Sequence, residues 1–151
     1  GDDQQDLLHD LAALSTDGTP PPLHASCTRP AILRRIAACA ADAVPADADR
    51  IASRIDDEIL AAAVSLHTGV PFVAVGGGEF AGDLHPGERV VVVGYVLDAA
   101  VRALVFELEE RGLRHDGTVA VYGGIPRPGE TVLVPRPAAT ATERDGATDE
   151  R

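Results

Sequence analysis

The sequence predicts an α/β protein built on an open, mainly parallel β-sheet with helices on both faces. Three observations lead to this prediction. Short apolar runs alternate along the chain with longer segments in which apolar residues recur every three or four positions. The run at 89–93 holds four consecutive valines, a pattern typical of a parallel strand that is covered on both faces. With 45% hydrophobic residues in 151, the chain can also bury a core.

The first segment, residues 1–29, is predicted to be an N-terminal helix followed by a proline-rich connector. Within residues 1–18 four leucines share one helical face: Leu7, Leu8, Leu11 and Leu14. The prolines at 20–22 end this helix because proline lacks the amide donor that a helix interior needs.

The core, residues 30–135, is predicted to alternate strands and helices. It opens with a helix from Pro30 to about Val44, in which the proline fills the first turn. The elements that follow are a strand at 50–53, a helix at 56–67, strands at 70–75 and 89–93, a helix at 97–112, and strands at 118–122 and 131–134. Residues 76–87 are predicted to be a loop, and residues 136–151, which have no periodic apolar face, a disordered tail.

Composition excludes several functions. The formal net charge of −11 disfavours nucleic-acid binding, and all thirteen basic residues are arginine, which excludes Schiff-base chemistry on lysine. No apolar run is long enough to span a membrane. Cys27 and Cys39 lack metal-site spacing and are interpreted as reduced, buried thiols of a cytoplasmic protein. The histidines are scattered, so we expect no metal and no cofactor.

Three apolar motifs then carry a resemblance to a known family. They are AAAV at 61–64, GVPF at 69–72 and PGERV at 86–90. Residues 47–123 resemble the core of type I phosphoribosyltransferases, with the orotate phosphoribosyltransferase subgroup as the nearest match. The resemblance implies a phosphoribosyltransferase-like fold, a crevice at the carboxyl ends of the strands, and pairing into a homodimer or with an active relative.

The loop that would bind phosphoribosyl diphosphate departs from the family pattern. Where the family has two acidic residues that hold the ribose hydroxyls, this chain has Gly94 and Tyr95. The following turn holds Asp98, Ala99 and Ala100 in place of small hydroxyl residues and glycine. We expect Asp98 to cap the next helix and to place negative charge where the 5′-phosphate would lie.

The two other loops of the family's site depart as well. The pyrophosphate loop is usually small and contains glycine, but here it holds Arg54, Asp56 and Asp57, interpreted as a solvated helix start. Arg54 either contacts an anion or pairs with one of these aspartates. The catalytic loop is short and lysine-free, and His85 is its one side chain that titrates near neutral pH.

Two hypotheses follow. In the first, the protein is a degenerate orotate phosphoribosyltransferase-like protein that has lost phosphoribosyl diphosphate binding and acts as a non-catalytic binding or scaffold subunit. In the second, it is an enzyme of altered chemistry, a nucleotide- or natural-product-related transferase or lyase, that binds a small molecule in the same crevice. The catalytic candidates of the second hypothesis are Asp98, Tyr95 and His85.

Overall fold

The computed structural model describes residues 2–14 and 20–135, and the tail predicted at 136–151 lies outside this range. The helices are α1 (Asp2–Leu14), α2 (Leu23–Cys27), α3 (Pro30–Asp42), the 3-10 turn η1 (Ile55–Asp57), α4 (Glu58–Thr68) and α5 (Ala99–Glu110). The strands are β1 (Arg50–Arg54), β2 (Phe72–Gly76), β3 (Glu79–Ala81), β4 (Arg89–Val96), β5 (Arg114–Gly123) and β6 (Glu130–Pro135).

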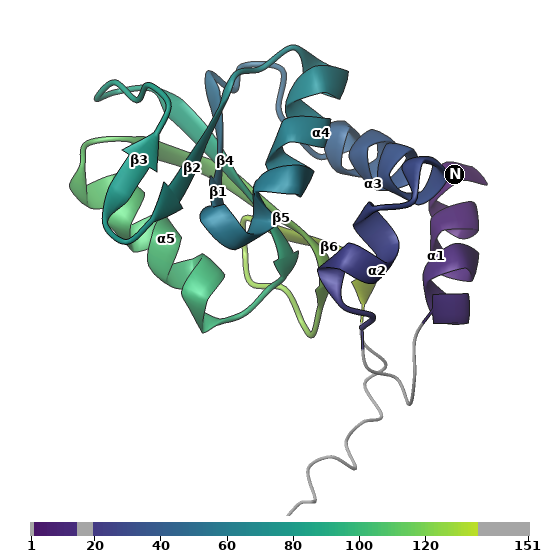
Figure 1. Cartoon of the computed structure of the whole chain (residues 1–151). Coiled ribbons are helices and arrows are strands. Elements are labelled where there is room, and N and C mark those ends of the chain that lie inside the picture. The colour runs from purple at the N-terminus through teal and green to yellow at the C-terminus, as the bar shows by residue number, and fades with distance from the viewer. Residues whose placement is uncertain (1, 15–19, 136–151) are drawn as a thin grey trace, which may run out of the picture.

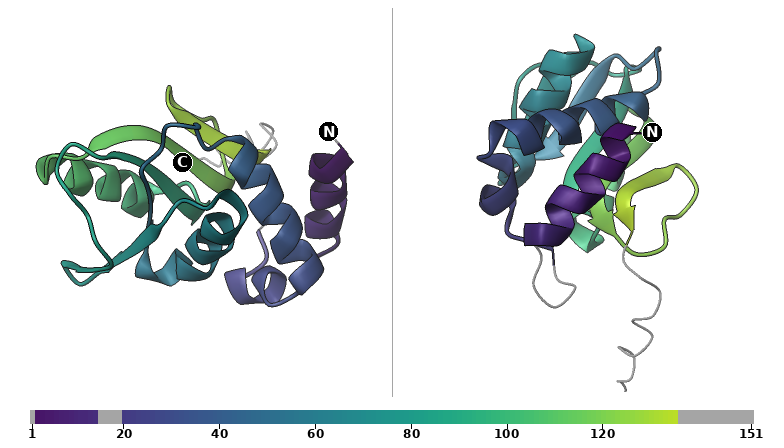
Figure 2. Two further views of the ribbon diagram at one scale, coloured as in Figure 1. Left: turned by 90° about the horizontal axis from the view of Figure 1, so that it is seen from above. Right: turned by 90° about the vertical axis from the view of Figure 1, so that its right-hand side faces the viewer.

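One six-stranded sheet, in the order β3-β2-β1-β4-β5-β6, forms the centre of the molecule (Figure 1). All strand pairs are parallel except the pair of β2 with the edge strand β3. Helices α1 to α4 cover one face and α5 covers the other (Figure 2). The predicted open, mainly parallel sheet with helices on both faces is therefore confirmed.

The valine run of β4 shows why the sequence forms two cores. Successive residues of a strand point to opposite faces. Val91 and Val93 accordingly pack among the helices α1 to α4, and Val90 and Val92 pack beneath α5. All four are buried, which is what the continuous apolar run predicted, since a strand covered on both faces has no exposed side.

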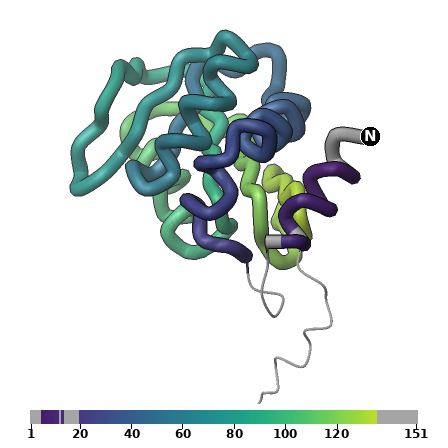
Figure 3. Tube along the Cα trace, turned by 45° about the vertical axis from the view of Figure 1, so that its right-hand side comes forward, coloured from purple at the N-terminus to yellow at the C-terminus, as the bar shows by residue number. Residues whose placement is uncertain are grey.

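The predicted N-terminal helix is confirmed as α1. Leu7 and Leu11 are fully buried, and an ion pair between Asp10 and Arg35 joins α1 to α3. Helix α1 and strand β3 lie at opposite ends of the molecule (Figure 3). The helix predicted to begin at Pro30 is also confirmed, with the proline in its first turn.

Two short elements were not predicted. Helix α2 follows directly after the three prolines, and β3 lies inside the segment predicted to be a loop. Gly77 and Gly78 have φ angles of 60° and 81° and form the two-residue turn that joins β2 to β3. Such a turn requires positive φ at both central positions, which is why glycine occupies both.

The burial of the two cysteines agrees with the sequence analysis. Cys27 and Cys39 are both buried and free. Among the described residues, no helix has the length and apolar character needed to cross a membrane.

Candidate functional site

The point where the sheet changes winding direction lies between β1 and β4. These neighbouring strands are parallel, so their carboxyl ends meet at one edge of the sheet. After β1 the chain turns through η1 into α4 on one face, whereas after β4 it enters α5 on the other face (Figure 2). Open α/β sheets bind ligands in the crevice at such a point.

Asp57 lies buried in this crevice. Its residue is only 8% exposed, and its carboxylate accepts a hydrogen bond from the backbone N–H of Tyr95. It makes no cap hydrogen bond to α4. The interpretation of Asp57 as a solvated helix cap is therefore wrong, because the 3-10 turn directs the side chain toward β4 and away from solvent.

The environment of Asp57 raises the pKa of its carboxyl group. Burial is the largest cause, and the nearby charges of Asp98 and Asp56 act in the same direction. The Tyr95 amide and the Arg54 guanidinium lower the pKa without reversing the net shift. A buried carboxyl group with a raised pKa is a feature of many functional sites.

Gly94 lies in the strand β4, not in a loop after it, and no side chain fits there. A Cβ atom at this position would lie 2.9 Å from Val101 Cγ2 and 3.5 Å from Asp57 Oδ2. The first contact is closer than real Cβ atoms approach, so any side chain at this position would require Val101 of α5 to shift.

Tyr95 contributes its backbone to the crevice but directs its ring into the helical layer. The hydroxyl donates to the backbone oxygen of Pro21 at 2.5 Å and lies 3.2 Å from Ser26 Oγ. The ring packs edge-to-face on Tyr122 with centroids 5.3 Å apart. Burial raises the pKa of the Tyr95 hydroxyl. Because of these contacts the hydroxyl holds α2 against the sheet and is not brought together with Asp98.

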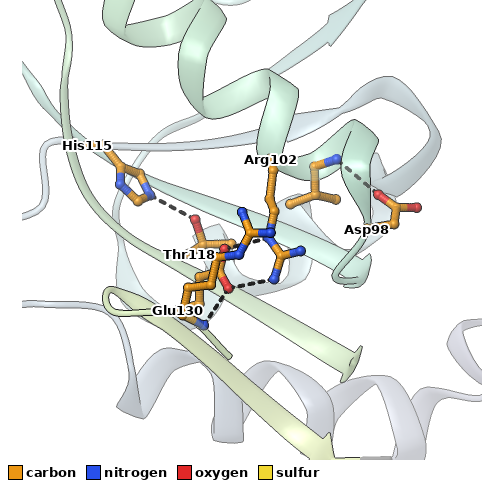
Figure 4. A network of polar contacts seen from close by, with 7 residues as sticks. Asp98, Arg102, His115, Thr118 and Glu130 are labelled. Atoms are coloured by element: carbon orange, nitrogen blue, oxygen red, sulfur yellow. Dashed lines mark hydrogen bonds and ion pairs between the residues drawn. The ribbon is translucent and has the colours of Figure 1, made fainter. Parts of the chain in front are cut away.

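Asp98 caps α5, as the sequence predicted. Its Oδ1 accepts a hydrogen bond of 3.0 Å from the Val101 amide (Figure 4). Ala99 and Ala100, which follow, are exposed in the first turn. The Asp98 side chain therefore binds at the helix N-terminus, which is a position where free amides could otherwise bind an anionic ligand.

Arg54 pairs with Asp56, with 3.1 Å between Nη2 and Oδ2. Of the two expectations for Arg54, the ion pair is the one observed. Arg54 and Ala100 also border a hollow of about 310 Å³ beside the crevice, together with the glycine turn 76–78 and Glu107. Glu107 was not among the predicted site residues. Its position beside the hollow could have been inferred, because Ala100, Ala103 and Glu107 recur at helical spacing on one face of α5.

His85 lies at a different place. It belongs to the exposed turn before β4, and its backbone N–H donates to Glu88 Oε1 at 2.9 Å. It borders a cavity near Arg111, just beyond the last turn of α5, whereas Asp98 precedes the first turn. A helix of 12 residues is about 18 Å long, so these two candidates are far apart.

The crevice thus brings together one cation and three carboxylates: Arg54, Asp56, Asp57 and Asp98.

Farther along α5, a bidentate ion pair between Arg102 and Glu130, with 2.9 Å for both hydrogen bonds, fastens the helix to β6 (Figure 4). Among the described residues there is no group of three side chains that could hold a metal ion.

Topology and site together define an open α/β protein with its crevice at a topological switch point. More specifically, the fold is that of the type I phosphoribosyltransferases, and comparison with solved structures confirms it. No family model and no curated protein matches the chain.

Three solved structures illustrate the likeness. Orotate phosphoribosyltransferase of Mycobacterium tuberculosis, in complex with inorganic phosphate, superposes with a TM-score of 0.74 at 14% identity, over 89% of this chain and 96% of that chain. UMP synthase of Leishmania donovani gives 0.66 at 20% identity, over 93% of this chain and 38% of that chain. Adenine phosphoribosyltransferase of Thermoanaerobacter pseudethanolicus gives a TM-score of 0.65 at 14% identity, over 85% of this chain and 99% of that chain.

Proposed function

We propose that this protein is a degenerate orotate phosphoribosyltransferase-like protein that does not bind phosphoribosyl diphosphate and acts as a non-catalytic binding or scaffold subunit. The observation that supports this most strongly is that two carboxylates of the protein itself bind backbone amides at the crevice. Asp98 accepts the amide of Val101 at the N-terminus of α5, and Asp57 accepts the amide of Tyr95 beside it.

Charge opposes a polyanionic ligand in such a crevice. Three carboxylates face one guanidinium, and that guanidinium is already paired with Asp56. The loss of two charge-assisted hydrogen bonds, at ~1.5–3 kcal/mol each, weakens binding roughly 10²- to 10⁴-fold at about 1.4 kcal/mol per tenfold. Repulsion by Asp57 and Asp98 adds to this loss.

A subunit role requires a partner, and we propose a homodimer or a complex with an active relative, in the cytoplasm. Several large apolar side chains are exposed on the described surface and could be covered by such a partner: Leu66, Phe106 and Ile125. The negative net charge disfavours nucleic acid as that partner.

The alternative function is an enzyme of altered chemistry in the same crevice. One observation favours it: the buried Asp57, whose raised pKa suits a carboxyl group that gives or takes a proton. Because the crevice is acidic, its ligand would be neutral or cationic.

An assay of orotate consumption tests the proposed function. Purified protein, phosphoribosyl diphosphate, Mg²⁺ and orotate are mixed, and the absorbance of orotate is followed beside an active orotate phosphoribosyltransferase. We expect no turnover above the rate without protein. Steady turnover that survives a further purification step, and that Asp57→Asn abolishes, would overturn the proposal in favour of the enzyme.

A further inference from the structure

A second cavity, of about 660 Å³, lies at the opposite end of α5 from the crevice. Beside His85 and Pro86 of the turn before β4, six residues supply most of its charge and apolar surface: Glu79, Phe80, Asp83, Leu84, Arg111 and Leu113. They come from the β3 hairpin, from the loop that follows it and from the end of α5, which lie beside one another (Figure 1). None of the four charged residues of the crevice borders this cavity. Its volume is that of a small-molecule site.

An apolar surface forms part of its lining. Leu113 is buried, and Phe80 and Leu84 are half-buried at the margin of the core beneath α5. An aromatic ring offered by a ligand would therefore contact Leu84, Leu113 and the part of the Phe80 ring that Arg111 does not cover, and would remove apolar surface from water.

Arg111 supplies a positive charge beside the Phe80 ring. Its guanidinium carbon lies 4.0 Å from the centroid of the Phe80 ring, a cation–π contact. Its ion pair with Glu107 spans 4.0 Å, which is too long for a hydrogen bond. The N–H groups of a guanidinium held in this way suit a carboxylate, which they bind in bidentate fashion.

Glu79 and Asp83 supply negative charge in the same lining. Both are exposed, and neither makes an ion pair or side-chain hydrogen bond among the described residues. A ligand that carried only a carboxylate would be repelled by these two side chains, whereas an ammonium group would be attracted to them.

Backbone hydrogen bonds fix one wall of the cavity in place. The Gly87 amide donates to the Gly112 oxygen and the Arg114 amide to the Glu88 oxygen, both at 2.8 Å. The turn that holds His85 and Pro86 is thereby fastened to the end of α5. A wall that is already ordered reduces the entropy lost when a ligand binds.

We propose that this cavity binds a small zwitterion with an apolar ring, of the class of the aromatic α-amino acids. Arg111 binds the carboxylate, Glu79 or Asp83 binds the ammonium group, and the ring lies on Phe80, Leu84 and Leu113. The site is separate from the crevice, so it stands whether or not the proposed function does.

Titration with L-phenylalanine, followed by NMR of the leucine methyl and phenylalanine ring signals, tests the proposal. We expect saturable shifts at Phe80, Leu84 and Leu113. Binding should weaken at least tenfold for 3-phenylpropanoate, which lacks the ammonium group, and for 2-phenylethylamine, which lacks the carboxylate. No shift at about 10 mM L-phenylalanine, a concentration that detects even millimolar affinity, would overturn the proposal. Shifts confined to Leu104, which borders the hollow beside the crevice and not this cavity, would overturn it as well.

A pair of matched variants locates the site. Arg111→Gln should weaken L-phenylalanine binding at least tenfold, whereas Arg114→Gln, at an exposed arginine outside the cavity, should leave it unchanged. Circular dichroism confirms that both variants are folded. Equal binding by both variants would contradict the role of Arg111. Neither result depends on whether phosphoribosyl diphosphate binds in the crevice.

Discussion

At the scale of single residues, two buried polar side chains determine which charged and polar groups the crevice offers. Asp57 brings a charge into the crevice, and Tyr95 turns a hydroxyl away from it into the helical layer. A sequence pattern could identify these residue types but not their directions, because both depend on the 3-10 turn after β1 and on the extension of β4 to Val96.

Asp57 should make stability depend on pH. Its pKa is raised in the folded state, so the folded protein holds this proton more tightly than the unfolded chain does. Its favourable contribution is complete below the unfolded pKa and is lost as the pH rises through the folded pKa, with a slope of at most ~1.4 kcal/mol per pH unit. In urea unfolding, the stability of Asp57→Asn relative to the unchanged protein should therefore rise with pH across this window, and the variant should be the more stable of the two at pH 7.

Two features keep this test specific. Asp116 has a raised pKa through burial and its neighbour Asp47, and the hydrogen bonds from Arg50 and Arg102 lower the pKa of Glu88 and of Glu130. These three groups titrate in both proteins, so the comparison with the variant isolates Asp57. Asp56→Asn is the control, since Asp56 is exposed. If Asp57→Asn and Asp56→Asn have the same pH profile, Asp57 is not the buried acid described here.

Tyr95→Phe should destabilise the protein by about 1–3 kcal/mol, because it leaves the Pro21 oxygen without its buried donor and removes one of the partners of the Ser26 hydroxyl. Chemical denaturation measures the loss. A double-mutant cycle with Ser26→Ala should show coupling between the two side chains. Unchanged stability of Tyr95→Phe would contradict the described position of the hydroxyl.

At the scale of elements, the long and periodic segments were predictable. The valine strand, the helix after it and the helix that begins at Pro30 follow from apolar spacing and from one proline. Helix α2 has five residues and β3 has three, too few for any period to show. The turn at Gly77 and Gly78 did carry a signal, since two adjacent glycines between apolar runs favour a hairpin.

Asp98→Ala should remove the cap of α5 and lower stability by about 1 kcal/mol, whereas Asp98→Asn should retain most of it, because an asparagine oxygen also accepts the Val101 amide. Thermal unfolding of the two variants at one pH measures the difference. Equal stability of Asp98→Ala and the unchanged protein would mean that the cap contributes nothing.

At the scale of the whole molecule, the fold is shared with phosphoribosyltransferases although identity to the solved structures named above is at most 20%. The sheet and its switch point place the crevice in a position that the sequence pattern predicted. What the crevice holds depends on a few side chains, which the fold alone does not determine.

Assembly belongs to this scale too. We expect light scattering at tens of micromolar protein to give the mass of a dimer, or a pull-down to recover a phosphoribosyltransferase relative. The exposed side chains of Leu66 and Phe106, 89% and 71% accessible, lie on different helices and mark surfaces that a partner could cover. A strictly monomeric mass together with an empty pull-down would contradict the subunit role.

The most direct test of the central claim, that the acidic crevice rejects a polyanionic ligand, is calorimetric titration of the protein with phosphoribosyl diphosphate in the presence of Mg²⁺. We predict no saturable heat at millimolar ligand, both for the unchanged protein and for Asp98→Asn, because Gly94 and Tyr95 still offer no carboxylate to the ribose hydroxyls. Saturable binding with micromolar affinity would contradict the account.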